Sequence, residues 1–366
     1  MDGYARPNTL TRLPDIPTYM SNLTIGLPVY NAMPFLEEGL DSLLRQTDGD
    51  FTILAIDDGS TDSGLKYLRS VKDSRLRVMT QPNRGLTHTL NRMLYEADTP
   101  WLMRHDADDV ALPDRVAIVR RSIELFPEAG MFYSEARYYQ NSRSVGTFRS
   151  SRGTPDDLRQ ITTQGYLLAI CHPTVTLNVD KAISLGGYRF DLHIEDIDLW
   201  WRMALSYEIR YLPQVTTYFR HNEASVSTAN LEPQSMNTLY VQYLLLSHLH
   251  GWLPSTYECV RGHLEQNIDR AKLACREEMR RANILFGQRQ YGKACVHLGK
   301  AAMAHPSYFA KRVLYELHTD GVVFNGEEPS QFLRQRDLFW PEEESQNTPT
   351  PPGLRVPGNA GYTECV

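Results

Sequence analysis

Two clusters of carboxylates in the N-terminal third of the sequence have the residue types of a cation site. Asp57-Asp58-Gly59-Ser60 follows the apolar segment 51–56, and Asp106-Ala107-Asp108-Asp109 follows the apolar segment 101–104. Like charges held this close together repel one another, and carboxylate oxygens are the ligands that Mg²⁺ and Mn²⁺ prefer. One such cluster is also typical of a solvated acidic turn, but two of them after neighbouring strands favour a divalent metal.

The segments before these clusters belong to a regular alternation of short apolar runs and amphipathic stretches. The runs 23–29, 51–56, 76–79 and 101–104 have the length of strands, and apolar residues at helical spacing follow the first three. Strands alternating with helices of this length predict βαβ units around a mostly parallel central sheet, which is an α/β fold. In such sheets ligands bind beyond the carboxyl ends of the strands, where both clusters lie.

Composition divides the chain into four parts. From the N-terminus we predict an irregular arm (1–21), the α/β domain (22–232), a helical C-terminal region (233–340) and a disordered tail too poor in apolar residues to pack (341–366). Within the helical region, the apolar spacing from Ala282 to Pro306 is that of a single tetratricopeptide-type repeat. A single repeat of this kind predicts a helical hairpin.

Charge and cysteine content exclude several classes of protein. The 366 residues hold 38 Lys and Arg against 44 Asp and Glu, and the resulting charge of -6 has the wrong sign for a broad nucleic-acid surface. The most apolar short run, 243–246, is far shorter than the ~20 residues of a membrane-spanning helix. The first twenty residues lack the apolar core of a secretory signal. Five widely spaced cysteines fit a reduced compartment, so we expect a cytoplasmic protein.

Five motifs in a fixed order carry a resemblance to a known family. They are Pro28-Val29-Tyr30-Asn31, Asp57-Asp58-Gly59-Ser60-Thr61-Asp62, Asn83-Arg84-Gly85-Leu86, Asp106-Ala107-Asp108-Asp109 and Glu195-Asp196. Together they resemble a family 2 glycosyltransferase with the GT-A fold, over about residues 23–228. The resemblance implies a metal-dependent enzyme, using Mn²⁺ or Mg²⁺, that transfers a sugar from a nucleotide donor to an acceptor hydroxyl with inversion at the anomeric carbon.

The resemblance assigns the donor site to three loops. By this similarity Asp58 accepts a hydrogen bond from the uracil of a UDP-sugar, while Pro28, Tyr30 and Asn31 form the other wall of the base pocket. The segment beginning at Asn83-Arg84 precedes a helix, so its backbone amides and the Arg84 side chain are expected to meet the diphosphate. Asp57 is expected to hold its own loop.

The same resemblance distributes the metal ligands. Asp108 is expected to coordinate the metal directly, Asp106 to contact the ribose or the metal and its water shell, and Asp109 to support them. His221 matches a position that reaches the metal or the diphosphate, and a plain surface histidine is an equal alternative. If His105 lies under the site, its charge would make activity sensitive to mildly acidic pH.

The acceptor side depends on one acidic pair. Asp196, with Glu195 as second choice, matches the family's general base, which removes the proton of the acceptor hydroxyl as the new bond forms. Alternatively, both acids only stabilise the N-terminus of the helix predicted to begin near Ile197.

The substrates implied are a UDP-linked hexose or N-acetylhexosamine and a hydroxyl of a glycan or lipid-linked acceptor, in polysaccharide or glycoconjugate biosynthesis. Two other functions stay open: a nucleotidyltransferase, although residues 25–36 contain no Arg or Lys, and a non-catalytic protein that keeps the fold. Basic residues of the helical region either contact an anionic membrane surface, giving a peripheral location at its inner face, or form a solvated face. These residues are Lys272, Arg276, Arg280, Arg281, Arg289 and Lys293.

Overall fold

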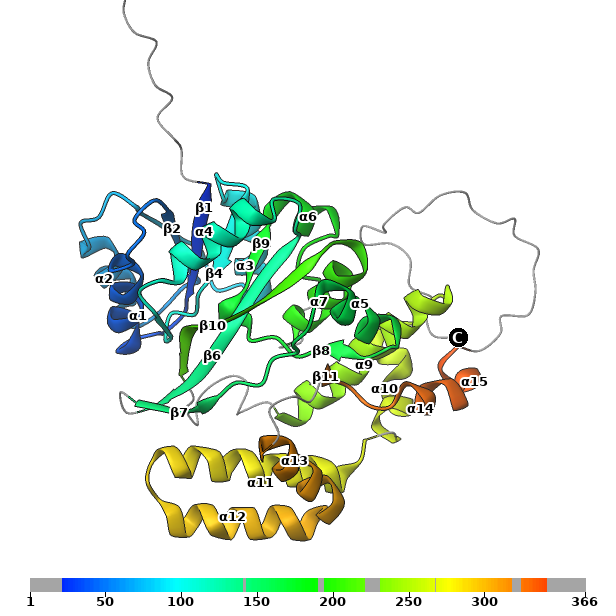
Figure 1. Ribbon diagram of the computed structural model, residues 1–366. Helices are drawn as coiled ribbons and strands as arrows, with labels where there is room; N and C mark the ends of the chain where they lie inside the picture. The colour runs from blue at the N-terminus through cyan, green and yellow to red at the C-terminus, as the bar shows by residue number, and fades with distance from the viewer. Residues whose placement is uncertain are drawn as a thin grey trace, which may run out of the picture.

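The computed structural model describes residues 22–140, 143–189, 194–220, 231–266, 268–317 and 324–340. A twisted sheet with helices on both faces forms the larger part, and a helical region lies against one end and below it (Figure 1). The predicted arm 1–21 and tail 341–366 lie outside the described residues. No helix in the described ranges is both long enough and apolar enough to cross a membrane.

The first half of the domain repeats strand and helix. Its elements are β1 (Leu23–Val29), α1 (Phe35–Leu44), β2 (Thr52–Asp57), α2 (Gly64–Ser70), β3 (Leu76–Thr80), α3 (Leu86–Glu96) and β4 (Trp101–Arg104). The strands pair in parallel in the order β3-β2-β1-β4, so their carboxyl ends meet at one edge of the sheet. The predicted βαβ units and the α/β fold are confirmed.

The second half of the domain adds antiparallel strands. It contains β5 (Val110–Ala111), α4 (Arg115–Leu125), β6 (Met131–Gln140), β7 (Arg143–Thr147), α5 (Pro155–Thr163), β8 (Leu167–Leu168), β9 (Thr176–Asn178), α6 (Val179–Ser184), α7 (Glu195–Ser206) and β10 (Ile209–Arg220). The sheet continues from β4 as β9-β6-β10-β5, and β9 is antiparallel to both of its neighbours. Since β4 and β6 are each antiparallel to β9, they run in the same direction.

Apolar residues fill both faces of the sheet. In β2, Ile53 and Ala55 pack into the core beneath α1 and α4, whereas Leu54 and Ile56 pack into the core beneath α3, α5 and α7. Successive side chains of a strand point to opposite faces, so a strand covered on both sides must be apolar throughout. This explains why the strands of the first half appear in the sequence as continuous apolar runs.

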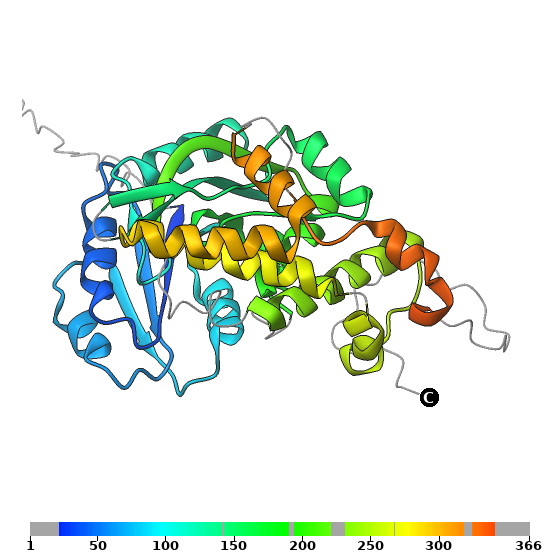
Figure 2. The same cartoon turned by 90° about the horizontal axis from the view of Figure 1, so that it is seen from below.

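The C-terminal region is helical, as predicted. It contains α9 (Leu231–His250), α10 (Tyr257–Gln266), α11 (Arg270–Gly287), α12 (Tyr291–Ala304), α13 (Pro306–Leu317), β11 (Phe324–Asn325), α14 (Pro329–Arg334) and α15 (Arg336–Phe339). The helices α11 and α12 form the predicted hairpin (Figures 1 and 2). The short strand β11 pairs with β8, and Val241 and Leu245 of α9 pack against Trp201 of α7, so this region shares a core with the α/β domain.

Candidate active site

The loop after β2 is bound to the loop before α3. The carboxylate of Asp58 is buried and accepts hydrogen bonds from the backbone N–H groups of Arg84 and Gly85, both at 2.9 Å, and from Gln81 Nε2 at 2.7 Å. Two of the amides expected to meet a diphosphate are therefore used by Asp58, and that part of the prediction is wrong. The Arg84 side chain is exposed, and its contact with a diphosphate stays a prediction, as does that of Asn83.

A glycine makes this close contact possible. Gly59 has φ +74°, and a Cβ at this position would lie 2.7 Å from the backbone nitrogen of Asn83. L-residues rarely adopt this region of φ, and the close approach leaves no room for a side chain. Beside it, Asp57 accepts a hydrogen bond from Thr80 Oγ1 at 3.1 Å. Asp57 also accepts from the backbone N–H of Ser60 at 3.4 Å, so it contacts its own loop as well as the end of β3.

The loop after β1 joins the same edge of the sheet. Asn31 Oδ1 accepts a hydrogen bond from the backbone N–H of Thr61 at 2.8 Å, and the backbone N–H of Asn31 donates to Ser60 Oγ at 3.0 Å. The neighbouring Tyr30 is 53% exposed, whereas Pro28 is buried within β1. Tyr30 and Asn31 thus present surface beside the β2 loop, and their contact with a base stays a prediction, as does that of Pro28.

The second acidic cluster lies at the end of β4. Arg104 is buried, and its Nη2 donates to Asp106 Oδ1 at 2.5 Å, while Asp106 keeps 28% of its side chain exposed. Burial, and then the charge of Asp106, raises the pKa of Asp108 to about 6. Burial, followed by the charges of Asp108 and Asp106, raises the pKa of Asp109 well above its ordinary value. If fully ionised, the cluster would therefore carry more negative charge than its protein neighbours neutralise.

These residues fit a divalent cation. Asp109 is fully buried, and although its Oδ1 accepts from the backbone N–H of Arg220 at 2.7 Å, its Oδ2 has no hydrogen-bond partner among the described residues. No three His, Cys, Asp or Glu side chains in the described ranges form a complete metal cage. Mg²⁺ commonly takes one or two protein carboxylates and completes its shell with water and substrate phosphates. Asp106 and Asp108 are suited to such a site.

The predicted general base, Asp196, is distant in the sequence but belongs to the same side of the sheet. Asp196 lies in the first turn of α7, and its Oδ1 accepts from the backbone N–H of Ile197 at 2.8 Å. Burial raises the pKa of Asp196 to about 6; the charge of Arg104 lowers it and that of Asp106 raises it further. The fields of Arg104 and Asp106 thus reach both the metal-type cluster and Asp196. Glu195 beside it is buried, whereas Asp196 is half-buried.

Residues 24–182 match the family described as Glycosyl transferase family 2. These residues belong to that family. An uncharacterised glycosyltransferase of Haemophilus influenzae is 29% identical over 198 residues, covering 53% of this chain and 73% of its own. The poly-beta-1,6-N-acetyl-D-glucosamine synthase of Staphylococcus aureus is 24% identical over 212 residues, covering 56% and 52%. Among solved structures, S. aureus TarS 1–349 in complex with UDP has 16% identity and a TM-score of 0.49, covering 87% of this chain and 88% of its own.

The predicted family is therefore confirmed for residues 24–182, and the predicted enzyme class, a glycosyltransferase, is confirmed with it. The matched residues include four of the five motifs, from Pro28 to Asp109, while Glu195-Asp196 lies beyond the match.

Sequence reasoning missed the ion-pair network that positions α7 in this glycosyltransferase. Asp198 is fully buried and lies 2.6 Å from Arg189 Nη2 and 2.6 Å from Arg202 Nη2. Burial raises the pKa of Asp198, but the charges and hydrogen bonds of Arg202 and Arg189 outweigh it and hold that pKa below the usual value. Arg202 also donates to the carbonyls of Leu185 and Gly187, at 2.6 and 2.7 Å. The spacing of Asp198 and Arg202 by four residues was the available signal.

His105 does lie under the site, but it does not carry the predicted charge. The residue is fully buried, and its Nδ1 lies 2.9 Å from Arg115 Nη1 and accepts from it. Burial, and then the charges of Arg115 and Arg104, hold its pKa well below the usual value. His105 therefore stays neutral at mildly acidic pH, and the predicted pH sensitivity through this residue is wrong. Arg115, which sequence reasoning also missed, binds the carbonyls of Arg104 and Pro173.

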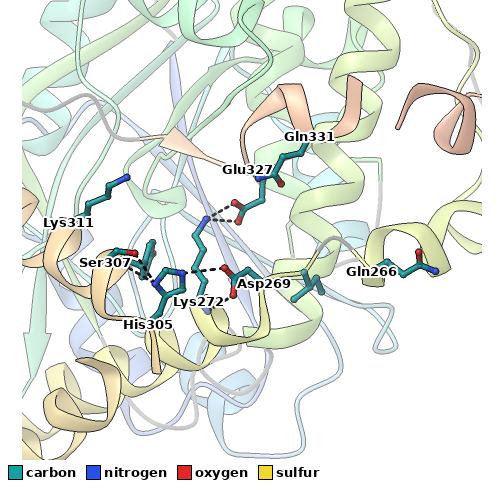
Figure 3. A pocket seen from close by; sticks show the side chains of 10 residues that line it. Gln266, Asp269, Lys272, His305, Ser307, Lys311, Glu327 and Gln331 are labelled. Atoms are coloured by element: carbon teal, nitrogen blue, oxygen red, sulfur yellow. Dashed lines mark hydrogen bonds and ion pairs between the residues drawn. The ribbon is translucent and has the colours of Figure 1, made fainter. Parts of the chain in front are cut away.

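Two further features lie apart from this site. His221 falls outside the described residues, so its role stays a prediction. A cavity of about 460 Å³ lies between α11, α13 and the segment before α14, and none of the predicted site residues lines it (Figure 3). At this cavity Lys272 forms an ion pair with Glu327 at 2.5 Å, and His305 Nε2 lies 3.3 Å from Asp269 Oδ2.

Proposed function

We propose that this glycosyltransferase transfers a hexose or N-acetylhexosamine from a UDP-sugar to a hydroxyl of a glycan or lipid-linked acceptor, with inversion and with the help of Mn²⁺ or Mg²⁺. The observation that carries the proposal is the acidic cluster at the carboxyl end of β4, next to the loops after β1 and β2, where the fully buried Asp109 Oδ2 has no hydrogen-bond partner among the described residues. A metal-type acidic pair and a separate carboxylate with a pKa of about 6 are what a single displacement requires.

The two acidic groups have different tasks in this proposal. Asp106 and Asp108 would hold the cation, which stabilises negative charge on the departing nucleoside diphosphate. Asp196 removes the proton of the acceptor hydroxyl while the new carbon–oxygen bond forms and the bond to the diphosphate breaks. A base with a pKa of about 6 is mostly ionised at neutral pH and still strong enough to accept a proton. Because one displacement occurs, the anomeric configuration inverts.

The donor is bound by the three loops at the sheet edge. The exposed ring of Tyr30 supplies a flat surface for a base, and Asn31 fixes the loop beside it. Asp58, which also holds the 84–85 backbone, is the proposed acceptor of a hydrogen bond from the uracil. The exposed Arg84 guanidinium is suited to a diphosphate. The polysaccharide role is supported by the similarity to a synthase that is named for a polymer of N-acetylglucosamine.

The test is calorimetric titration of the full chain with UDP-, GDP- and dTDP-sugars, each with Mn²⁺ and with a chelator. We expect micromolar binding of a UDP-sugar that disappears with the chelator. Binding of a GDP- or dTDP-sugar instead would contradict the assignment of the nucleotide. Equal binding with and without metal would contradict the role of Asp106 and Asp108.

A further inference from the structure

One stretch of the C-terminal region has a charge opposite to that of the whole chain. Between Met279 and Tyr315 the sequence contains seven Lys and Arg residues and no Asp or Glu, although the chain as a whole has a charge of -6. A basic block in an otherwise acidic protein produces a local positive field, which attracts anionic surfaces. The block covers the end of α11, all of α12 and most of α13.

Only some of the basic residues singled out in the sequence are available for binding. Lys272 is paired with Glu327 at 2.5 Å, and Arg281 is paired with Glu278 at 3.1 Å. Lys293 and Lys300 of α12 are exposed, and in the described part of the chain no carboxylate lies within ion-pair distance of either. Lys293 and Lys300 are therefore two exposed basic side chains on one helix, α12.

Apolar side chains lie between these lysines on the outer face of α12. Ala294 and Ala301 are fully buried and mark the inner face of the helix, whereas Val296 is 58% and Met303 is 76% exposed. Residues seven apart lie almost in line after two turns. Val296 and Met303 therefore form one row on the outer face, and Lys293 and Lys300 form a second row beside it.

Two glycines on α12 leave the surface beside these rows without side chains. A Cβ at Gly292 or Gly299 would meet no atom within 4 Å, so both positions open to solvent. The apolar row and the lysine row therefore project beyond the backbone around them. A helix with exposed apolar residues flanked by lysines has the pattern of a helix that lies in a membrane interface.

The α11–α12 hairpin lies on the side of the molecule that holds the active site. Gln140, the last residue of β6, contacts Gly287 at the end of α11, since a Cβ on Gly287 would overlap its side chain. The strand β6 runs in the same direction as β4, whose carboxyl end carries Asp106 and Asp108. Figure 2 shows the hairpin running across this side of the molecule.

We propose that the outer face of α12 docks on a bilayer that contains anionic lipid. The lysines are attracted to the lipid phosphates, and Val296 and Met303 enter the boundary between headgroups and acyl chains. A nucleic acid would bind the lysines but gain nothing from the exposed apolar row. The docked hairpin brings the carboxyl edge of the sheet toward the membrane surface. Membrane docking does not depend on the identity of the sugar donor.

The experiment is cosedimentation of the full chain with vesicles of phosphatidylcholine alone and of phosphatidylcholine with about a third phosphatidylglycerol. We expect binding only to the anionic vesicles, with partial release by salt. The double variant Lys293→Glu/Lys300→Glu should lose about tenfold or more in vesicle affinity. The control Lys66→Glu/Lys72→Glu makes the same charge change at exposed positions in and beside α2 and should keep the affinity. The double variant Val296→Ser/Met303→Ser should lower the fraction of vesicle binding that persists at high salt.

Three results would overturn the proposal. They are absence of binding to anionic vesicles at low salt, equal losses in the α12 variant and its control, and tighter binding to a DNA duplex than to vesicles. Circular dichroism of each variant shows whether the fold is kept, and UDP-sugar titration shows whether the donor site is kept. A variant that passes both and still loses vesicle binding has lost only the membrane-binding surface. A failure of the donor assignment alone leaves vesicle binding intact.

Discussion

Replacing Asp198 by Asn should destabilise the protein strongly, although the residue contacts no substrate in the proposed reaction. Asp198 is fully buried with Arg202 6% exposed, and its carboxylate is bound by two guanidinium groups and by Trp201 Nε1 at 3.2 Å. Removing one partner of a buried ion pair leaves uncompensated buried charge and costs about 3–5 kcal/mol. We therefore expect Asp198→Asn to lower the free energy of unfolding by about that amount.

The chain contains a matched control. Asp41 and Arg45 are also four residues apart on a helix, at 2.9 Å, but their side chains are 49% and 80% exposed. Exposed pairs of this kind contribute about 0.3–0.5 kcal/mol, so Asp41→Asn should change stability little. Urea denaturation of both variants at neutral pH measures the difference. A loss below about 1 kcal/mol for Asp198→Asn would show that the buried network is not what holds α7 in place.

The same residue predicts a pH dependence of stability. Because the folded pKa of Asp198 is depressed, the unfolded chain binds its proton more readily than the folded one. The stabilising contribution is therefore fully present above the unfolded pKa near 3.9 and is lost as the pH falls through the lower folded value. In Asp198→Asn the free energy of unfolding should be lower than in the wild type at neutral and alkaline pH. It should no longer contain the decrease at acidic pH that protonation of Asp198 causes.

Three further predictions concern the site. Asp196→Asn should lower turnover by at least ~10² with donor affinity kept, whereas Asp108→Ala should weaken metal-dependent donor binding; equal losses of donor affinity would contradict the two roles. Because the base must be ionised, the transfer rate at saturating Mn²⁺ should rise through a pH of about 6 and level off above it, and this limb should be absent in Asp196→Asn. Gly59→Ala should cost about 1–3 kcal/mol in urea denaturation and weaken donor binding, because the new methyl group meets the backbone of Asn83. Gly186→Ala, at φ +85° with open space around it, should cost about 1 kcal/mol and leave donor binding unchanged.

The sequence was most informative where a local pattern decides the structure. The apolar runs of β1, β2 and β4 predict buried strands because side chains on both faces are covered, and the α11–α12 hairpin follows from helical spacing alone. The antiparallel entry of β9 between β4 and β6 could not be predicted, since it depends on pairing between distant segments.

In the candidate site, too, some features follow from local sequence and others depend on contacts between distant segments. The residue types and close spacing of Asp106 and Asp108 are enough by themselves to suggest a cation. The use of Asp58 to bind the 84–85 backbone, and the neutral state of His105, depend on donors and charges brought from other loops. Both features arise only when the loops meet at the carboxyl edge of the folded sheet, so no short segment of the sequence predicts them.

The contact between the helical region and the α/β domain determines where this protein can be divided. Gln242 of α9 is fully buried; its Nε2 donates to the carbonyls of Gly165 at 2.9 Å and Glu327 at 2.7 Å, and its Oε1 accepts from the backbone N–H of Glu327 at 2.8 Å. A truncation at residue 232 would leave the carbonyl of Gly165 without this donor and would open the β8–β11 pairing and the apolar contact of Trp201. Chimeras that exchange acceptor specificity with other family members should therefore carry residues 231–340 together with the catalytic domain as one exchangeable unit.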